Sequence, residues 1–297
     1  MSNSATSRSP SPVAPLAEAL EGASALDPLG EKVGEAVRGL IKPGALKDAL
    51  SGTWLGHALH PLLTDVVIGS FTSANALDLL GGDEDGRAAE RLIGLGIAAY
   101  LPTALTGVTD WADSELGDLG VRRVGLVHAG SNAIALGLYA ASLRARRRGN
   151  RTRGKLLGLS GAAALGAGGF LGGHMSYAQG IGVDQTVFDA GPEDWSEAGA
   201  SDDLAEGSPT RVTVDDTPVM LLRHRDALHA LHDRCSHRGC SLSDGEIDGE
   251  SVVCTCHGSR FRLADGSIER GPATTPQPAY EVRERDGTIE VRLRVDG

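Results

Sequence analysis

The chain has 297 residues, which is enough for about two domains, and its 28 basic and 39 acidic residues give a formal net charge of −11. A chain this acidic is not expected to bind nucleic acid, because phosphate binding requires clustered positive charge. The mean hydropathy is close to neutral, but this average conceals two parts of different character. Residues 57–180 are rich in Gly, Ala and Leu, whereas the flanking regions are polar.

The first 56 residues fall into two segments. Residues 1–15 are mostly Ser, Pro and Ala and predict a disordered tail, and no apolar stretch follows a basic start as it would in a signal peptide. Residues 16–56 predict an amphipathic helical segment, because Asp27-Pro28 is a helix-start signal and apolar residues then recur at helical spacing until Pro43-Gly44. Such a helix either lies on a membrane surface or packs against its own protein, and the pattern leaves both open.

Residues 57–180 contain four long apolar segments, at 61–80, 92–109, 124–143 and 156–173. Each is close to the ~20 residues that a helix needs to cross a bilayer. Their many Gly, Ala and Ser residues are typical of closely packed membrane helices. A soluble bundle is the alternative, but the fourth segment has no polar face, which favours the membrane. The expected fold of this part is an all-α four-helix transmembrane bundle.

The connection after the third segment predicts the orientation. Residues 144–155 contain seven basic residues and no acidic one, and loops of this kind remain in the cytoplasm. Both termini and the C-terminal domain would then lie on the outer face of the cell membrane. A cytoplasmic C-terminal domain is the alternative.

Several polar residues lie near the ends of these segments. In an up-down bundle the starts of helices one and three share a face with the ends of helices two and four. This arrangement predicts that five residues gather on the face that bears the C-terminal domain: His57, His60, Asp110, His128 and His174. They could bind haem b, contact a quinone, or only form hydrogen bonds at the interface.

Short motifs in this region resemble a family of small four-helix membrane domains of no settled function. The resemblance covers about residues 50–183 and rests on His60-Pro61, Thr106-Gly107, Asp110-Trp111, His128 and Gly172-Gly173-His174.

The remainder of the chain predicts a linker and an all-β domain. Residues 181–193 have three acidic residues and no basic one, as in a tether. Residues 194–297 contain short alternating runs separated by turn signals such as Asp265-Gly266 and Asp286-Gly287, which predict a β-sandwich. With twelve basic and twenty acidic residues, this domain has a net charge of −8. That charge either steers a basic partner such as a c-type cytochrome or is an ordinary solvated surface.

All four cysteines lie in this domain, within Cys235-Ser-His237, Cys240 and Cys254-Thr-Cys256-His257. Two cysteines paired with two histidines suit a [2Fe–2S] cluster in which histidines replace two cysteines on one iron. A Cys₂His₂ zinc site is the alternative, although zinc knuckles usually begin with Cys-x₂₋₄-Cys, and Cys235-Ser-His237 is a poor match to that spacing. The histidines outside these motifs, at positions 224, 229 and 232, are expected at the surface.

These motifs, extended to Gly258-Ser259 and followed by Gly271-Pro272-Ala273, resemble the three loops of a Rieske iron–sulfur domain. The resemblance implies that Cys235 and Cys254 bind one iron of the cluster, and that His237 and His257 bind the outer iron.

The resemblance is to the Rieske subtype of the cytochrome bc complexes, in which cysteines at the positions of Cys240 and Cys256 form a disulfide. Two free thiols are the alternative. The resemblance also assigns cluster tuning to four residues: Gly258, Ser259, Phe261 and Pro272. The resemblance implies that the Ser259 hydroxyl donates to a bridging sulfide and raises the potential, whereas Phe261 stands where that subtype has a tyrosine. We therefore expect an intermediate potential within roughly −150 to +300 mV.

The sequence as a whole predicts a membrane-anchored Rieske protein that carries single electrons from quinol or a membrane haem to a redox partner. It is expected to be an electron-transfer component and not a self-contained enzyme. The alternatives are a component of a multi-subunit oxidoreductase or oxygenase that works with a catalytic subunit, and an iron–sulfur redox sensor.

Overall fold

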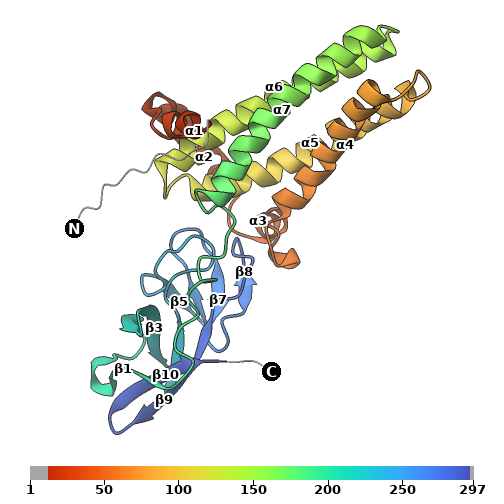
Figure 1. Ribbon diagram of the computed structural model, residues 1–297. Coiled ribbons are helices and arrows are strands. Elements are labelled where there is room, and N and C mark those ends of the chain that lie inside the picture. The colour runs from red at the N-terminus through yellow and green to blue at the C-terminus, as the bar shows by residue number, and fades with distance from the viewer. Residues whose placement is uncertain (1–12, 295–297) are drawn as a thin grey trace. The chain divides into compact units, whose positions relative to one another are not determined.

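The computed structural model describes residues 13–294, which form two compact units. The first unit combines the described residues up to Gly39 with Leu62–Ile181, and it is helical. The second combines Leu40–Pro61 with the described residues from Gly182 onward, and most of it is β-structure (Figure 1). The predicted combination of an all-α part and an all-β part is confirmed.

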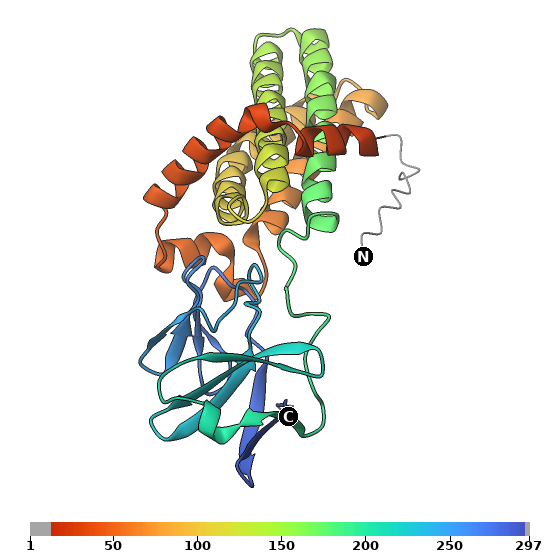
Figure 2. The same ribbon diagram turned by 90° about the vertical axis from the view of Figure 1, so that its left-hand side faces the viewer.

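The helical unit contains two short N-terminal helices and four long ones. In chain order these are α1 (Ala14–Glu21), α2 (Asp27–Leu40), α4 (Leu59–Leu80), α5 (Gly86–Ser114), α6 (Leu119–Arg147) and α7 (Arg151–Tyr177). Side-chain caps fix two of the starts, because the Asp118 carboxylate accepts hydrogen bonds from the first turn of α6 and the Asn150 side chain accepts one from the first turn of α7. Helices α6 and α7 then lie side by side (Figures 1 and 2).

Three helices of the described chain are long and apolar enough to cross a membrane, namely α5, α6 and α7. The predicted number of four spans is therefore not supported, because α4 does not qualify. Helix α4 carries Asp65 and Asp78 together with several hydroxyl side chains, which lower its apolar character.

The interior of the helical unit is built around two stacked rings. The centroids of Phe71 and Tyr139 lie 3.7 Å apart, and the Asn75 amide donates a 2.6 Å hydrogen bond to the Tyr139 hydroxyl. A Cβ atom at Gly96 would lie 2.5 Å from the Phe71 ring, so α5 can approach α4 this closely only because it has a glycine there. Small residues have this role in packed membrane helices.

Helix α2 packs against its own protein, as one of the two roles predicted for it requires. Its residues Val33 and Val37 pack against Trp111 and neighbouring apolar residues of α5 and α6. Arg38 of α2 is paired with the fully buried Glu115, with 2.5 Å between the charged atoms. Of the predicted tail, residues 1–12 lie outside the described residues, and α1 already begins at Ala14.

The β-part of the second unit has two antiparallel sheets. The larger sheet has the order β1-β10-β9-β4-β3-β2 and the smaller has the order β5-β6-β7-β8. The strands are β1 (Ser196–Ala200), β2 (Thr210–Val214), β3 (Thr217–His224), β4 (Ala227–His232), β5 (Glu246–Asp248), β6 (Ser251–Val253), β7 (Arg260–Arg262), β8 (Ile268–Arg270), β9 (Ala279–Arg285) and β10 (Thr288–Leu293).

Tight turns and a shared core hold these sheets in register. The two-residue turns Asp215-Asp216, Arg225-Asp226 and Asp286-Gly287 have positive φ angles, which match the twist of the hairpins they close. One buried cluster contains Leu222 of the larger sheet, Phe261 of the smaller sheet, and both Cys235 and Cys254. The cysteine loops are therefore rooted in the core between the sheets.

Two further segments belong to this second unit. Helix α3 (Ala45–Ser51) and the short 3₁₀ turn Thr53–Leu55 come from the region between α2 and α4. The segment predicted as a linker is bonded to the β-domain at several points, since the Tyr280 hydroxyl donates to the Ala190 carbonyl and the Gln185 N–H donates to the Ser236 carbonyl.

Candidate metal centre

The two cysteine-histidine motifs form loops with the same backbone pattern. In the first loop the Cys235 N–H donates to the Cys240 carbonyl and the Gly239 N–H donates back to the Cys235 carbonyl, both at 2.8 Å. In the second loop Cys254, Ser259 and Gly258 make the same two bonds at 2.8 and 2.9 Å. Both glycines have φ near +80°, a conformation that side chains rarely adopt. The backbone therefore has the same conformation around Cys235 in the first loop as around Cys254 in the second.

A third loop, residues 271–278, braces the first two. The Gln277 side chain accepts from the Ser236 N–H at 2.9 Å and donates to the carbonyls of His232 and Arg234 at 2.6 Å. The Ala273 N–H donates to the Ser259 hydroxyl at 3.0 Å. Gln277 is therefore a positioning residue that the sequence did not indicate, because a single glutamine in a loop has no distinctive pattern.

Asp233 is a second residue that the sequence did not indicate. It is 1% exposed, and its carboxylate accepts 2.7 Å hydrogen bonds from the Ser241 hydroxyl and from both the N–H and hydroxyl of Ser243. Three donors on one carboxylate fix the path of the chain on either side of the first cysteine loop.

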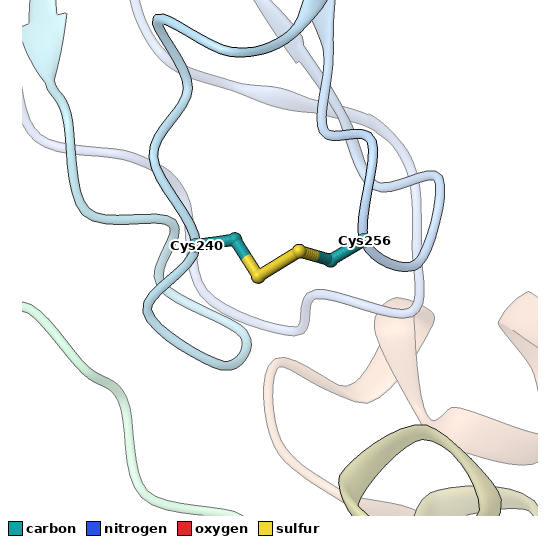
Figure 3. The surroundings of a disulfide bond; sticks show 2 residues. All are labelled: Cys240 and Cys256. Atoms are coloured by element: carbon teal, nitrogen blue, oxygen red, sulfur yellow. A yellow bond between two sulfur atoms is a disulfide. The ribbon is translucent and has the colours of Figure 1, made fainter. Parts of the chain in front are cut away.

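The predicted disulfide is present and joins the first two loops. Cys240 and Cys256 are separated by 16 residues, and their sulfur atoms are bonded (Figure 3). The Cys254 sulfur lies within 4.8 Å of both disulfide sulfurs. Because a disulfide sulfur is not a thiolate, only Cys235 and Cys254 remain as cysteine donors for a metal.

The two free thiols are buried and contact each other. Cys235 and Cys254 are each 1% exposed. The hydrogen bond from the Cys235 side chain, together with those from the backbone N–H groups of Cys256 and His257, lowers the pKa of Cys254 to about 7 against the opposing effect of burial. The pKa of Cys235 is raised by the same contact and by burial. This pair can supply thiolate sulfur to a metal.

The two histidines of the motifs lie beside each other. The ring centroids of His237 and His257 are 5.0 Å apart and the ring planes are nearly perpendicular, at 84°. The Nδ1 atom of His237 is buried and has no hydrogen-bond partner. Burial, followed by the charge of His257, lowers the pKa of His237 well below its ordinary value. A neutral imidazole with a vacant nitrogen is the form that binds a metal ion.

These donors fit a [2Fe–2S] cluster with two sulfur and two nitrogen ligands. A buried nitrogen without a partner costs free energy unless something occupies it, and iron would satisfy His237 Nδ1. The two buried thiols, which contact each other, would supply the two sulfur ligands of the cluster.

Residues 194–281 match the family described as "Rieske [2Fe-2S] domain". The match ends within the strand that follows the third loop, so it includes every loop described above. The chain belongs to the Rieske family through this domain. The Rieske domain implies a [2Fe–2S] cluster.

Relatives of the Rieske domain come from two kinds of system. The anthranilate 1,2-dioxygenase ferredoxin subunit of Burkholderia cepacia is 32% identical over 100 residues, which are 34% of this chain and 93% of that ferredoxin. The cytochrome b6-f complex iron-sulfur subunit of Chlorobaculum tepidum is 30% identical over 95 residues, which are 32% of this chain and 51% of that subunit. Both names are those of electron-transfer components.

Among solved structures, the ferredoxin of carbazole 1,9a-dioxygenase from Nocardioides aromaticivorans IC177 matches with a TM-score of 0.32 and 29% identity. The match covers 34% of this chain and 98% of that ferredoxin. Residues 56–185 of the helical part match a second family, described as "Predicted membrane protein (DUF2231)".

His128 and His174, two of the predicted site residues of the helical unit, have partners within the chain. His128 Nδ1 lies 2.8 Å from the Gly168 carbonyl and its Nε2 lies 3.2 Å from the Asn132 amide. His174 Nε2 lies 2.8 Å from the Glu21 carboxylate. Both ring nitrogens of His128 are thus occupied, and neither haem nor quinone is supported.

The predicted gathering of five residues on one face stays a prediction. Asp110, His128 and His174 belong to the helical unit, whereas His57 and His60 belong to the unit that contains the Rieske domain. The His57 ring contacts the neighbouring Ala58 carbonyl at 3.0 Å, and both His60 and Asp110 make contacts within the chain.

The surface location expected for His232 is wrong. His232 is fully buried, and its Nε2 lies 3.5 Å from the Asp189 carboxylate. It is the last residue of β4, where the strand passes into the core beneath the first cysteine loop. Two apolar neighbours in the chain, Ala230 and Leu231, are buried with it.

Proposed function

We propose that this protein is a membrane-anchored carrier of single electrons whose [2Fe–2S] cluster is bound by Cys235, Cys254, His237 and His257. The observation that carries the proposal is that two disulfide-joined loops hold two buried thiols in contact and a half-buried imidazole whose Nδ1 atom is buried and has no partner. The cluster supplies the one-electron chemistry, and the residues around it hold it, shield it and set its potential.

Ser259 and Phe261 set the potential in opposite directions under this proposal. The Ser259 hydroxyl oxygen accepts from the Ala273 N–H, which leaves the hydroxyl proton available to donate to a sulfur atom of the cluster when it is bound. A hydrogen bond to sulfur stabilises the reduced cluster and raises the potential. Phe261 is fully buried in the core but has no hydroxyl to donate. The expected potential is therefore intermediate within the Rieske range.

The helical unit supplies the anchor. Helices α5, α6 and α7 meet the length and composition required to cross a bilayer, and the region matches a family of membrane proteins. The basic connection 144–155 favours a cytoplasmic position for that loop and an outer position for the Rieske domain. The disulfide between Cys240 and Cys256 supports the same side, since such bonds persist in oxidising compartments.

The partners are other redox proteins. One relative belongs by name to a dioxygenase system and another to a cytochrome complex, so the acceptor is either an oxygenase subunit or a cytochrome. The net charge of −8 on residues 194–297 favours a basic partner surface.

The direct test is chemical analysis of the full chain purified in detergent. We expect two iron atoms and two acid-labile sulfides per chain, and loss of both in the Cys254→Ser variant, because serine oxygen is a poor ligand for this cluster. Zinc without labile sulfide in the unaltered protein would overturn the proposal.

A further inference from the structure

A short segment that precedes the membrane helices lies against the cluster loops. We call residues 43–53 the covering segment. It contains α3, and its last residue, Thr53, is the first residue of the 3₁₀ turn that follows. The Asp48 carboxylate accepts a 3.1 Å hydrogen bond from the Gly271 N–H, and the Thr53 hydroxyl donates a 3.1 Å bond to the Ala273 carbonyl. Both bonds are to the third loop.

The covering segment also approaches the second loop. A Cβ atom at Gly258 would lie 3.2 Å from the Pro43 ring, and one at Gly271 would lie 2.1 Å from the Thr53 hydroxyl. Glycine is therefore required at position 271 for the segment to come this close.

Lys47 is the unusual residue of this segment. It is one of only four lysines in the chain and is 4% exposed, although lysine is rarely buried. Its ammonium group is one of the charges that act on His237 of the first loop, after burial and the charges of His257 and Arg238. The covering segment thus contacts the second and third loops, and the positive charge of its buried Lys47 acts on His237 of the first loop.

We propose that Lys47 is a potential-setting residue, which favours the reduced cluster electrostatically and which Asp48 and Thr53 hold in position. This inference rests on the proposed function. Reduction adds one negative charge to the cluster, and a cation in a water-poor site interacts with that charge more strongly than it would in water.

The test is the midpoint potential of the full chain in detergent, measured by an EPR-monitored redox titration. Lys47→Met removes the charge at similar size and is expected to shift the potential downward. Lys47→Arg keeps the positive charge, and its midpoint potential is expected to lie close to that of the unaltered protein. Lys42→Met is the matched control, because Lys42 is an exposed lysine near the start of the same region, and no shift is expected there.

Asp48→Asn separates charge from packing. Asparagine keeps an acceptor oxygen for the Gly271 N–H but removes a negative charge, so the potential is expected to move upward, opposite to Lys47→Met. Equal downward shifts in Lys47→Met, Lys47→Arg and Asp48→Asn would show that loosening of the segment is responsible, and would overturn the inference.

The two levels of the proposal fail in different ways. If the unaltered protein has no cluster signal, the proposed function fails. If the signal is present and Lys47→Met has the same potential as the unaltered protein, only the role of Lys47 is refuted.

Discussion

The side chains of the cluster loops have two kinds of role: some supply ligand atoms for the metal, and others form hydrogen bonds that hold the loops in place. The sulfur and nitrogen donors come from two loops of identical backbone pattern. Buried polar groups such as Gln277, Asp233 and Ser259 satisfy the backbone of those loops. Loops that carry metal ligands need such support, because a ligand that moves changes both affinity and potential.

Ser259→Ala is expected to lower the midpoint potential while the cluster is retained. Loss of one hydrogen bond to a charged acceptor costs about 1.5–3 kcal/mol, which corresponds to roughly 60–130 mV for one electron. Ser236→Ala is the control, since the Ser236 hydroxyl donates to the Thr275 carbonyl. The role of Ser259 would be refuted by an unchanged potential in a redox titration, or by an equal shift in the control.

His232 predicts a pH dependence of stability. Its burial lowers its pKa, against an opposing effect of Asp189, and its Nδ1 accepts the Arg234 N–H. Below the pKa of about 6.5 in the unfolded chain, the unfolded state binds a proton that the folded state does not. Stability supplied by this group is therefore present at neutral pH and is lost as the pH falls, by at most about 1.4 kcal/mol per pH unit.

The measurement is the midpoint of urea unfolding of the Rieske domain at several pH values between 7 and 5. Unfolding is monitored by loss of the visible absorption of the cluster. His232→Gln is expected to flatten the curve, because glutamine does not titrate. An unchanged slope in this variant would mean that other groups cause the acid sensitivity.

At the scale of elements, the disulfide is a covalent connection between the first two loops. A bridge that closes a loop of this size contributes about 3 kcal/mol, chiefly by restricting the unfolded chain. The double variant Cys240→Ser/Cys256→Ser is expected to lose about this amount of unfolding free energy. Denaturation in urea measures it, and equal stability with and without a reducing agent in the unaltered protein would contradict it.

Helix α2 offers a second prediction at this scale. Glu115 is fully buried between Arg38 and Arg122, with 2.5 Å contacts to each. Glu115→Ala leaves Arg38 and Arg122 without the carboxylate that they pair with. Removing one partner of a buried ion pair costs about 3–5 kcal/mol of unfolding free energy. We expect α2 to detach and Arg38 to become a site of trypsin cleavage.

Glu90→Ala is the matched control for this experiment. Glu90 pairs with Arg147 at 3.3 Å near the surface, and an exposed pair contributes little. Proteolysis at Arg38 in both variants, or in neither, would contradict the structural role of Glu115.

The elements show what the sequence could predict. The sandwich strands follow from alternating runs and turn signals, because each is a local pattern. The role of Gln277 and the burial of His232 depend on residues distant in the chain, so no local pattern indicates them. The same holds for the covering segment, whose bonds from Asp48 and Thr53 span more than two hundred residues. The disulfide could be expected only through the family resemblance.

At the scale of the whole molecule, two separate families are joined in one chain. Residues 56–185 match a membrane-protein family and residues 194–281 match the Rieske family. Counting apolar segments predicted four spans, but the polar residues of α4 leave three helices that qualify. Residues 40–61 belong to the second unit although they precede the three candidate membrane-spanning helices in the chain, an association that composition alone could not predict.

The measurement that tests the central claim most directly is EPR of the purified full chain, in the oxidised state and after reduction with dithionite. A [2Fe–2S] cluster with mixed cysteine and histidine ligands is silent when oxidised and gives a rhombic signal from one unpaired electron per chain when reduced. We expect that signal, and its loss in the His257→Ala variant. A reduced protein with no signal and a full complement of zinc would contradict the account.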